Sequence, residues 1–283
     1  MEGFWEKVLE QNGLDLYKSS TEFGGELSTS EPIRIELLSS NGGLTVCGWD
    51  RPDFRITLHV SVRASCPEDA KERARELLVY IVEPARLLFD GCAFKEHNES
   101  FSVELFLPRE LSYHCDMQTS NGGVRYQDLT FEELHCRSSN GSLTADTVSG
   151  RHADLVTSNG SVNFRGSFDQ LTGRTNNGSI DLVADCPGNS FAELHSSNGS
   201  IRALVKDCAE VGIDLDVQNS IGSINIDLPE QHLQMNRKQV GGLMLKGSGK
   251  VTTQSPDYDK MQRHLRLVAR TSIGSITINS ATN

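Results

Sequence analysis

The chain has 283 residues and a formal net charge of −11, which argues against the basic surface that nucleic-acid binding requires. Hydrophobic residues make up 37% of the chain, aromatic residues only 6%, and 25 residues are glycine. This lean composition argues against one large central core and suits many short strands separated by tight turns.

The first predicted element is a short amphipathic helix near the N-terminus. Phe4, Trp5, Val8 and Leu9 recur there at helical spacing. Exposed strand edges invite edge-to-edge assembly, so a repetitive β fold needs capped ends. We therefore expect residues 1–30 to form an N-terminal cap.

From residue 33 onward, a short polar phrase recurs. Its clearest copies read Ser-Asn-Gly-Ser, at residues 139–142, 158–161 and 197–200. Six Asn-Gly pairs and two Ile-Gly variants share the frame, and four consecutive steps between them are 18 to 21 residues long. Such a fixed period indicates a repeat architecture. The second residue is glycine in all eight copies: Gly42, Gly122, Gly141, Gly160, Gly178, Gly199, Gly222 and Gly274.

Apolar and polar residues alternate strictly on both sides of each glycine. After the turn, for example, Val162 and Phe164 flank the polar Asn163. Before the turn, small polar side chains such as Thr157 occupy the inward position. Alternation with a period of two is typical of strands with one buried face. Each repeat is therefore predicted to be a strand, a turn and a second strand, followed by a short polar loop.

Two arrangements fit this pattern: antiparallel hairpins or a solenoid of stacked coils. A hairpin turn of type I′ needs positive φ at both central residues. Ile221 and Ile273 occupy the first central position in two copies, and β-branched residues resist positive φ. Only the glycine is then expected to need positive φ, as in a type II turn at the corner of a coil. We therefore favour a β-solenoid, in which inward hydroxyls hydrogen-bond along the stack.

Two long excursions interrupt the repeat, at residues 50–110 and 229–266. We expect the second to be an elaborated excursion near the C-terminal end of the stack. Alternation in the first predicts three strands, at residues 54–62, 86–94 and 101–107.

The first excursion also contains a predicted helix over residues 68–82, where apolar residues recur at helical spacing. Ser65 and Glu68 have the spacing of a capping box at its start. Pro84 is expected to end it.

The recurring phrase is similar to that of the bacterial "putative adhesin" family of β-strand repeats, which is largely a domain of unknown function. The resemblance is clearest over residues 111–228, covers 33–46 and 265–279 more loosely, and includes Leu107-Pro108-Arg109. It implies a single-stranded, β-helix-like stack. It carries no catalytic residue, because none is established for the family, and it suggests an envelope-associated or stress-related setting.

Candidate catalytic and metal-binding residues are few. Cys186 and Cys208 follow equivalent strands, but the sequence has no Cys-x-x-Cys or His-Glu-x-x-His motif. The glycine- and aspartate-rich nonapeptide of calcium-binding β-rolls is also absent. We therefore expect no catalytic residue, no cofactor and no metal. Five aspartates that follow second strands are interpreted as ordinary turn residues: Asp128, Asp146, Asp185, Asp207 and Asp227.

The cellular setting is predicted from what the sequence lacks. No apolar stretch is long enough for a signal peptide or a membrane span. The seven cysteines are odd in number. We therefore expect a soluble, acidic protein of the cytoplasm, with reduced thiols.

The outward residues of the second strands differ from repeat to repeat, whereas the apolar columns stay apolar. Recognition is expected where a rigid scaffold carries variable side chains. This outward column contains one carboxylate, that of Asp181, whereas glycoside hydrolysis needs a pair of carboxyl groups. The candidate binding column is Arg125, Thr144, Asn163, Asp181, Arg202 and Asn225.

Together these observations predict one all-β domain over residues 1–283. It would be a single-stranded β-solenoid with about eight recognisable coils, one inserted α-helix and terminal caps. The predicted function is a non-enzymatic scaffold or binding module for a protein or glycan partner. The alternatives are a structural solenoid that self-associates through its ends and a carbohydrate-active β-helix enzyme.

Overall fold

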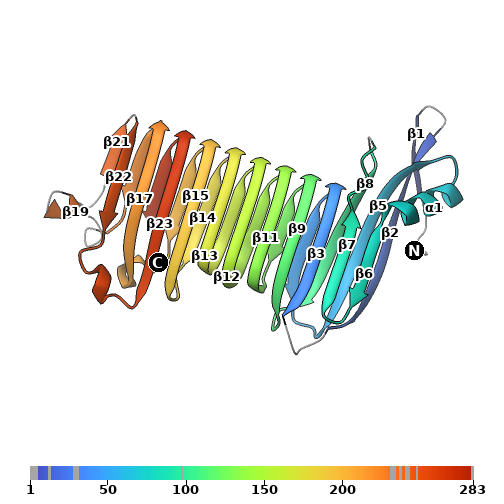
Figure 1. Cartoon of the computed structure of the whole chain (residues 1–283), viewed down its shortest axis with the longest axis horizontal. Coiled ribbons are helices and arrows are strands. Elements are labelled where there is room, and N and C mark those ends of the chain that lie inside the picture. The colour runs from blue at the N-terminus through green and yellow to red at the C-terminus, as the bar shows by residue number, and fades with distance from the viewer. Residues whose placement is uncertain are drawn as a thin grey trace. The chain divides into compact units, whose positions relative to one another are not determined.

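The computed structural model describes residues 6–11, 14–27, 32–96, 98–229, 234–235, 238–239, 243–246 and 248–281. Most of these residues lie in strands, which confirms the predicted all-β class, and one α-helix is found among them. The chain divides into two compact units, residues 1–141 and 142–283. Figure 1 shows the strands and the helix.

The first unit combines parallel coils with antiparallel strands. β3 pairs in parallel with β9 and β7, β9 with β11, and β4 with β10 and β8. From β8 the sheet continues in the order β8, β5, β2, β1, and each strand is antiparallel to the next. Strand β6 pairs antiparallel with β7. The elements are β1 (Glu6–Gln11), β2 (Leu14–Glu26), β3 (Ile33–Asn41), β4 (Leu44–Trp49), β5 (Asp53–Ala64), α1 (Pro67–Leu77), β6 (Val79–Glu83), β7 (Arg86–Gly91), β8 (Ser100–Pro108), β9 (Ser112–Asn121), β10 (Val124–Gln127) and β11 (Thr130–Asn140).

The second unit is a stack of parallel coils closed by an antiparallel edge. Its first strands pair in the order β12, β13, β15, β23, β17, and its second strands in the order β13, β14, β16, β24, β18. The elements are β12 (Leu143–Asn159), β13 (Val162–Asn177), β14 (Ile180–Asp185), β15 (Asn189–Asn198), β16 (Ile201–Val205), η1 (Cys208–Glu210), β17 (Val211–Ile221), β18 (Ser223–Asp227), β19 (Gln234–Met235), β20 (Lys238–Gln239), β21 (Leu243–Lys246), β22 (Gly249–Gln254), η3 (Tyr258–Lys260), β23 (Arg263–Ile273) and β24 (Ile276–Ser280).

The strands of successive repeats pair in parallel and in register, so the repeats form stacked coils and not antiparallel hairpins. Ile180 lies opposite Val162 on one side and Ile201 on the other, and all three are at most 1% exposed. Each apolar column of the sequence is therefore a buried ladder along the stack, as the alternation predicted.

The order of the coils in space differs from their order in the chain. The last repeat, β23 and β24, lies between the coil of β15 and β16 and the coil of β17 and β18. The excursion after residue 229 allows this order, because β22 and β21 pair antiparallel with β17 and β18 before the chain returns. The excursion thus covers strand edges that would otherwise remain open.

The turn glycines are required for a reason other than the predicted one. Gly42, Gly222 and Gly274 have φ between 137° and 148°, far from the value of about 80° of a type II turn, and Gly178 lies outside the left-handed range. The type II prediction is therefore wrong. A Cβ atom at Gly178 would lie only 2.0 Å from the carbonyl oxygen of Gly160 in the next coil. Glycine is needed because successive corners stack backbone on backbone.

The predicted hydrogen bonds of inward hydroxyls are confirmed. Thr175 donates to the carbonyl oxygen of Gly160 over 2.8 Å, and Ser196 donates to that of Gly178 over 2.9 Å. A second ladder joins the asparagine side chains, since Asn177 Nδ2 donates to Asn159 Oδ1 over 2.8 Å. Each corner therefore satisfies its polar groups along the stack.

The N-terminal helix prediction is wrong. Residues 6–11 form β1, which pairs antiparallel with β2, and Phe4 and Trp5 lie outside the described residues. A six-residue segment gains more hydrogen bonds from an adjacent strand edge than from an isolated helical turn, because helix nucleation is costly.

Helix α1 is shorter than predicted. It ends at Leu77, and Val79–Glu83 form β6 instead of the last helical turns. The N-cap is Cys66, whose Sγ accepts from the backbone N–H of Asp69, so the capping box starting at Ser65 is also wrong. The β-branched residues of β6 favour a strand once β7 offers a partner.

A half-buried ion pair holds α1 to the residue that precedes β8. Arg73 makes two hydrogen bonds to Glu99, of 2.7 Å and 3.1 Å, and the Glu99 side chain has no exposed surface. We expect Arg73→Ala to cost about 3 kcal/mol of unfolding free energy, because it removes the cation from a buried carboxylate that keeps only its hydrogen bond from the backbone N–H of Arg63. Urea unfolding measures this loss. Arg75→Ala, on the exposed side of α1, is the control and should change stability by less than about 0.5 kcal/mol.

Candidate functional site

The predicted binding column is distributed over both units. Arg125 lies on β10 in the first unit, beside Thr45 of β4. The other five residues lie in the second unit, where Thr277 of β24 separates Arg202 from Asn225. In spatial order this part of the column is Thr144, Asn163, Asp181, Arg202, Thr277 and Asn225.

The column in the second unit is a polar ladder with partial exposure. Thr144, Asn163, Asp181 and Asn225 are half-buried, and Arg202 is exposed. Asp181 and Arg202 form an ion pair, with Oδ1 and Nη1 3.5 Å apart. The charges of these two neighbouring side chains therefore partly neutralise each other.

The thiols and the aspartates of the sequence do not assemble a metal site. Among the described residues, no group of three or more His, Cys, Asp or Glu side chains is placed to hold a metal ion. Burial raises the pKa of Cys186 to about 11 and that of Cys208 to about 12. Both thiols are therefore protonated at neutral pH.

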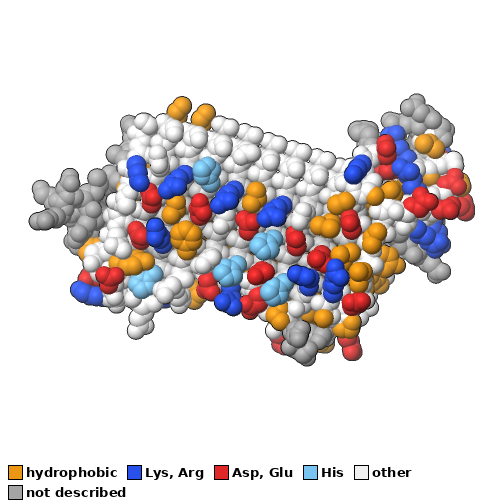
Figure 2. All heavy atoms as spheres, viewed as in Figure 1, with side chains coloured by type: hydrophobic (Ala, Val, Ile, Leu, Met, Phe, Trp, Pro, Cys, Tyr) orange, Lys and Arg blue, Asp and Glu red, His pale blue; other side chains and the backbone are white. Residues whose placement is uncertain are grey.

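The first strands carry a different surface. In Figure 2, basic, acidic and histidine side chains intermix on the face that contains β13, β15 and β23. Arg174 pairs with Glu193 at 3.4 Å, and Arg270 pairs with Asp216 at 3.1 Å. This face is a mosaic of charges of both signs, which does not suit a strongly charged polymer as partner.

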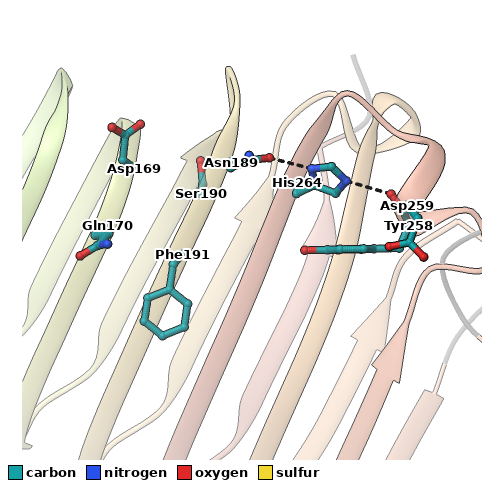
Figure 3. A pocket seen from close by; sticks show the side chains of 8 residues that line it. All are labelled: Asp169, Gln170, Asn189, Ser190, Phe191, Tyr258, Asp259 and His264. Atoms are coloured by element: carbon teal, nitrogen blue, oxygen red, sulfur yellow. Dashed lines mark hydrogen bonds between the residues drawn. The ribbon is translucent and has the colours of Figure 1, made fainter.

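A hollow of about 480 Å³ opens on this face near one end of the first strands (Figure 3). Strands β13, β15 and β23 supply one wall and η3 supplies the other. Aromatic rings, amides and carboxylates line it together, a combination that is typical of ligand sites. The lining residues are Asp169, Gln170, Asn189, Ser190, Phe191, Tyr258, Asp259 and His264.

His264 fixes the geometry of the hollow. Its Nδ1 hydrogen-bonds with Asn189 Oδ1 at 2.7 Å, and its Nε2 with the backbone oxygen of Tyr258 at 2.8 Å (Figure 3). The rings of Tyr258 and His264 also pack together, with centroids 4.5 Å apart. Gly212 leaves space for this packing, since a Cβ there would lie 3.2 Å from Tyr258. The histidine thus ties η3 to β15.

The hollow contains groups that can bind a ligand. Phe191 presents a half-buried ring, and Gln170 beside it is exposed. Burial, followed by the Asp214 carboxylate, raises the pKa of the Tyr258 phenol above its usual value, so the hydroxyl remains a hydrogen-bond donor at neutral pH.

Sequence reasoning missed this hollow. Phe191 is an aromatic residue at an outward strand position, where the alternation predicts a polar residue, and this departure is visible in the local sequence. Tyr258 lies in the C-terminal excursion, 67 positions further along the chain, and no local pattern joins it to Phe191. Only the insertion of β23 beside β15 brings the two regions together.

No curated protein matches the chain. Among solved structures, it is similar to a "putative cell adhesion protein" from Clostridium sporogenes, at 10% identity and a TM-score of 0.41, over 93% of this chain and 100% of that one. A "putative adhesin" from Bacteroides fragilis matches at 11% identity and a TM-score of 0.39, over 92% and 96%.

A family model gives the more specific result. The Toastrack DUF4097 model matches residues 89–257, which cover most coils of both units. This range includes β9 to β18 and ends just after β22. Because the matched region is well over half of the sequence, the chain belongs to the Toastrack DUF4097 family.

Proposed function

We propose that this protein is a non-enzymatic binding module and that its partner is a glycan. The observation that carries the proposal is the hollow beside β15, where the Phe191 ring lies among amide, hydroxyl and carboxylate groups. Sugar rings have apolar C–H faces and hydroxyl edges, so they match an aromatic ring bordered by hydrogen-bonding groups.

The groups of the hollow support binding rather than proton transfer. Both ring nitrogens of His264 are engaged by protein oxygens, so the ring is held as a structural link. Asp169 lies 3.9 Å from the guanidinium of Arg151. A general acid or base needs a free group poised at the reacting atom. We therefore propose recognition without catalysis.

The polar column of the second strands is proposed as a second contact surface, for a protein partner. Its side chains vary from rung to rung on a rigid ladder, as recognition surfaces on repeat scaffolds do. No described helix is long and apolar enough to cross a membrane. The family resemblance supports an envelope-associated setting.

Binding to a panel of neutral and acidic oligosaccharides tests the proposal. We expect at least one glycan to bind, and Phe191→Ala to weaken its affinity by about fivefold or more, since a lost aromatic contact costs about 1 kcal/mol or more. Thr172→Ala, an outward residue of β13, is the control and should leave affinity unchanged.

Three results would contradict the proposal. They are no binding to any glycan in the panel, equal affinity of wild type and Phe191→Ala, and the release of new reducing ends during incubation. A loss of binding confined to Arg202→Ala would instead place the glycan on the column of second strands.

We also propose that residues 1–283 fold as one domain, a single-stranded β-solenoid with about eight coils. The in-register parallel pairs within each unit support this organisation. Unfolding of the Ile180→Asp variant, followed by tryptophan fluorescence and circular dichroism, tests this proposal.

A further inference from the structure

Strand β6 in the first unit exposes apolar side chains on both of its faces. Val79 is 59% exposed, Tyr80 49% and Val82 38%. Successive strand residues point to opposite faces, so Val79 and Tyr80 lie on different sides of the sheet. Single apolar residues scattered over a surface are ordinary, whereas β6 has three exposed apolar side chains within four residues.

The same strand has an open edge. Among the described strands, β6 pairs only with β7, from Val79 opposite Asp90 to Glu83 opposite Arg86 (Figure 1). No other described strand pairs with the backbone N–H and C=O groups of its second edge. Proteins usually protect such edges with charged residues or proline inside the strand. In β6 the only charge is Glu83, at the end of the strand.

The sequence of β6 is complementary to itself in an antiparallel register. A two-fold axis at Ile81 places Ile81 opposite its own copy and Tyr80 opposite Val82 of the second copy. An aromatic residue opposite a β-branched one is a favourable cross-strand pair, worth roughly 0.2–1 kcal/mol. Glu83 then lies opposite Val79, so no like charges meet across the strands.

The neighbouring strands hold Tyr80 in place for this contact. Its ring stacks on Phe89, with centroids 6.2 Å apart and planes inclined by 8°, and lies 6.3 Å from Phe23. A side chain that is already ordered loses little conformational entropy on binding. The exposed half of the ring is therefore a preorganised anchor.

We infer that β6 is the interface of a homodimer, in which two copies of this chain pair antiparallel through β6. The contact is isologous, because the same strand serves both copies, so it closes after two subunits and does not produce a filament. This inference is independent of the proposed glycan site, because β6 lies in the first unit and the hollow in the second.

Sedimentation velocity of the full chain tests the dimer. Wild type should sediment as a dimer at micromolar concentration, and Val82→Lys should raise the dissociation constant by about 100-fold or more, since it places two charges in the apolar contact. Val82 is already exposed, so the variant should fold. Ile273→Lys is the matched control, because Ile273 is 52% exposed in the second unit, and it should remain dimeric.

A cysteine pair tests the register. Ile81→Cys should crosslink two chains under mild oxidation, because the two residues face each other across the axis. Val79→Cys should not crosslink beyond the wild-type background, since its copies lie about 13 Å apart along the strand direction. A monomeric wild type at 200 µM, or a dimer that survives Val82→Lys, would overturn the inference. Equal crosslinking of the two cysteine variants would overturn the two-fold register.

Discussion

Ile180→Asp is expected to unfold the second unit. Ile180 is 1% exposed and lies between Val162 and Ile201 in an apolar ladder. An aspartate there would place a carboxylate where the ladder offers only apolar partners, at a cost of about 4 kcal/mol or more. Urea unfolding followed by far-UV circular dichroism measures the loss.

The matched control is Thr144→Asp, which introduces the same side chain one column outward. Thr144 is half-buried on β12 and faces away from the core. Its replacement should change the free energy of unfolding by less than about 1 kcal/mol, the span of strand propensities. Equal losses in the two variants would show that the register of inward and outward columns is wrong.

The Ile180→Asp variant also tests whether the chain is one folding domain. Both tryptophans, Trp5 and Trp49, belong to the first unit, whereas Ile180 belongs to the second. If the units unfold together, Ile180→Asp should shift the tryptophan fluorescence transition as far as the circular dichroism transition. An unshifted fluorescence transition would show two independent domains.

Gly178→Ala is expected to be nearly as damaging as a charge in the core. The new Cβ atom would lie 2.0 Å from the carbonyl oxygen of Gly160, and Gly178's own backbone is hydrogen-bonded to Asn198. Backbone on both sides prevents either corner from moving away. We expect a loss of about 3 kcal/mol or more, at the upper end of what overpacking costs.

Gly188→Ala provides the comparison, because a Cβ atom at Gly188 would meet nothing within 4 Å. It should be neutral or stabilise the protein by up to about 1 kcal/mol, through the lower entropy of the unfolded chain. Thermal unfolding of the two variants measures the difference. Similar melting temperatures would refute the stacked corners as the reason for the glycines.

Asparagine at the first turn position has a different importance from glycine. Asn177 donates to Asn159 and accepts from Asn198, so the amides form a ladder along the corners. The ladder ends where Ile273 follows Asn198 in the stack. The two turn positions therefore have different roles: the amide contributes hydrogen bonds along the stack, whereas the glycine is required because a Cβ atom would not fit.

The sequence by itself determined that the repeats form coils and which side chains face the interior of each coil. Alternation around Val162 and Phe164 assigns both residues to the core, and the prediction that small inward hydroxyls hydrogen-bond along the stack is confirmed at Thr175. These assignments succeeded because the period of a strand and the hydrogen-bonding needs of a small side chain are local properties. They hold wherever a coil lies in the stack.

Only the tertiary structure decided what stacks on what. The placement of β23 beside β15, the hollow between Phe191 and Tyr258, and the change from helix to strand at β6 all depend on partners far away in the chain. Each depends on which of several similar strand edges a given strand pairs with. A repeat makes those edges alike in sequence, so the choice rests on the packing of the whole stack.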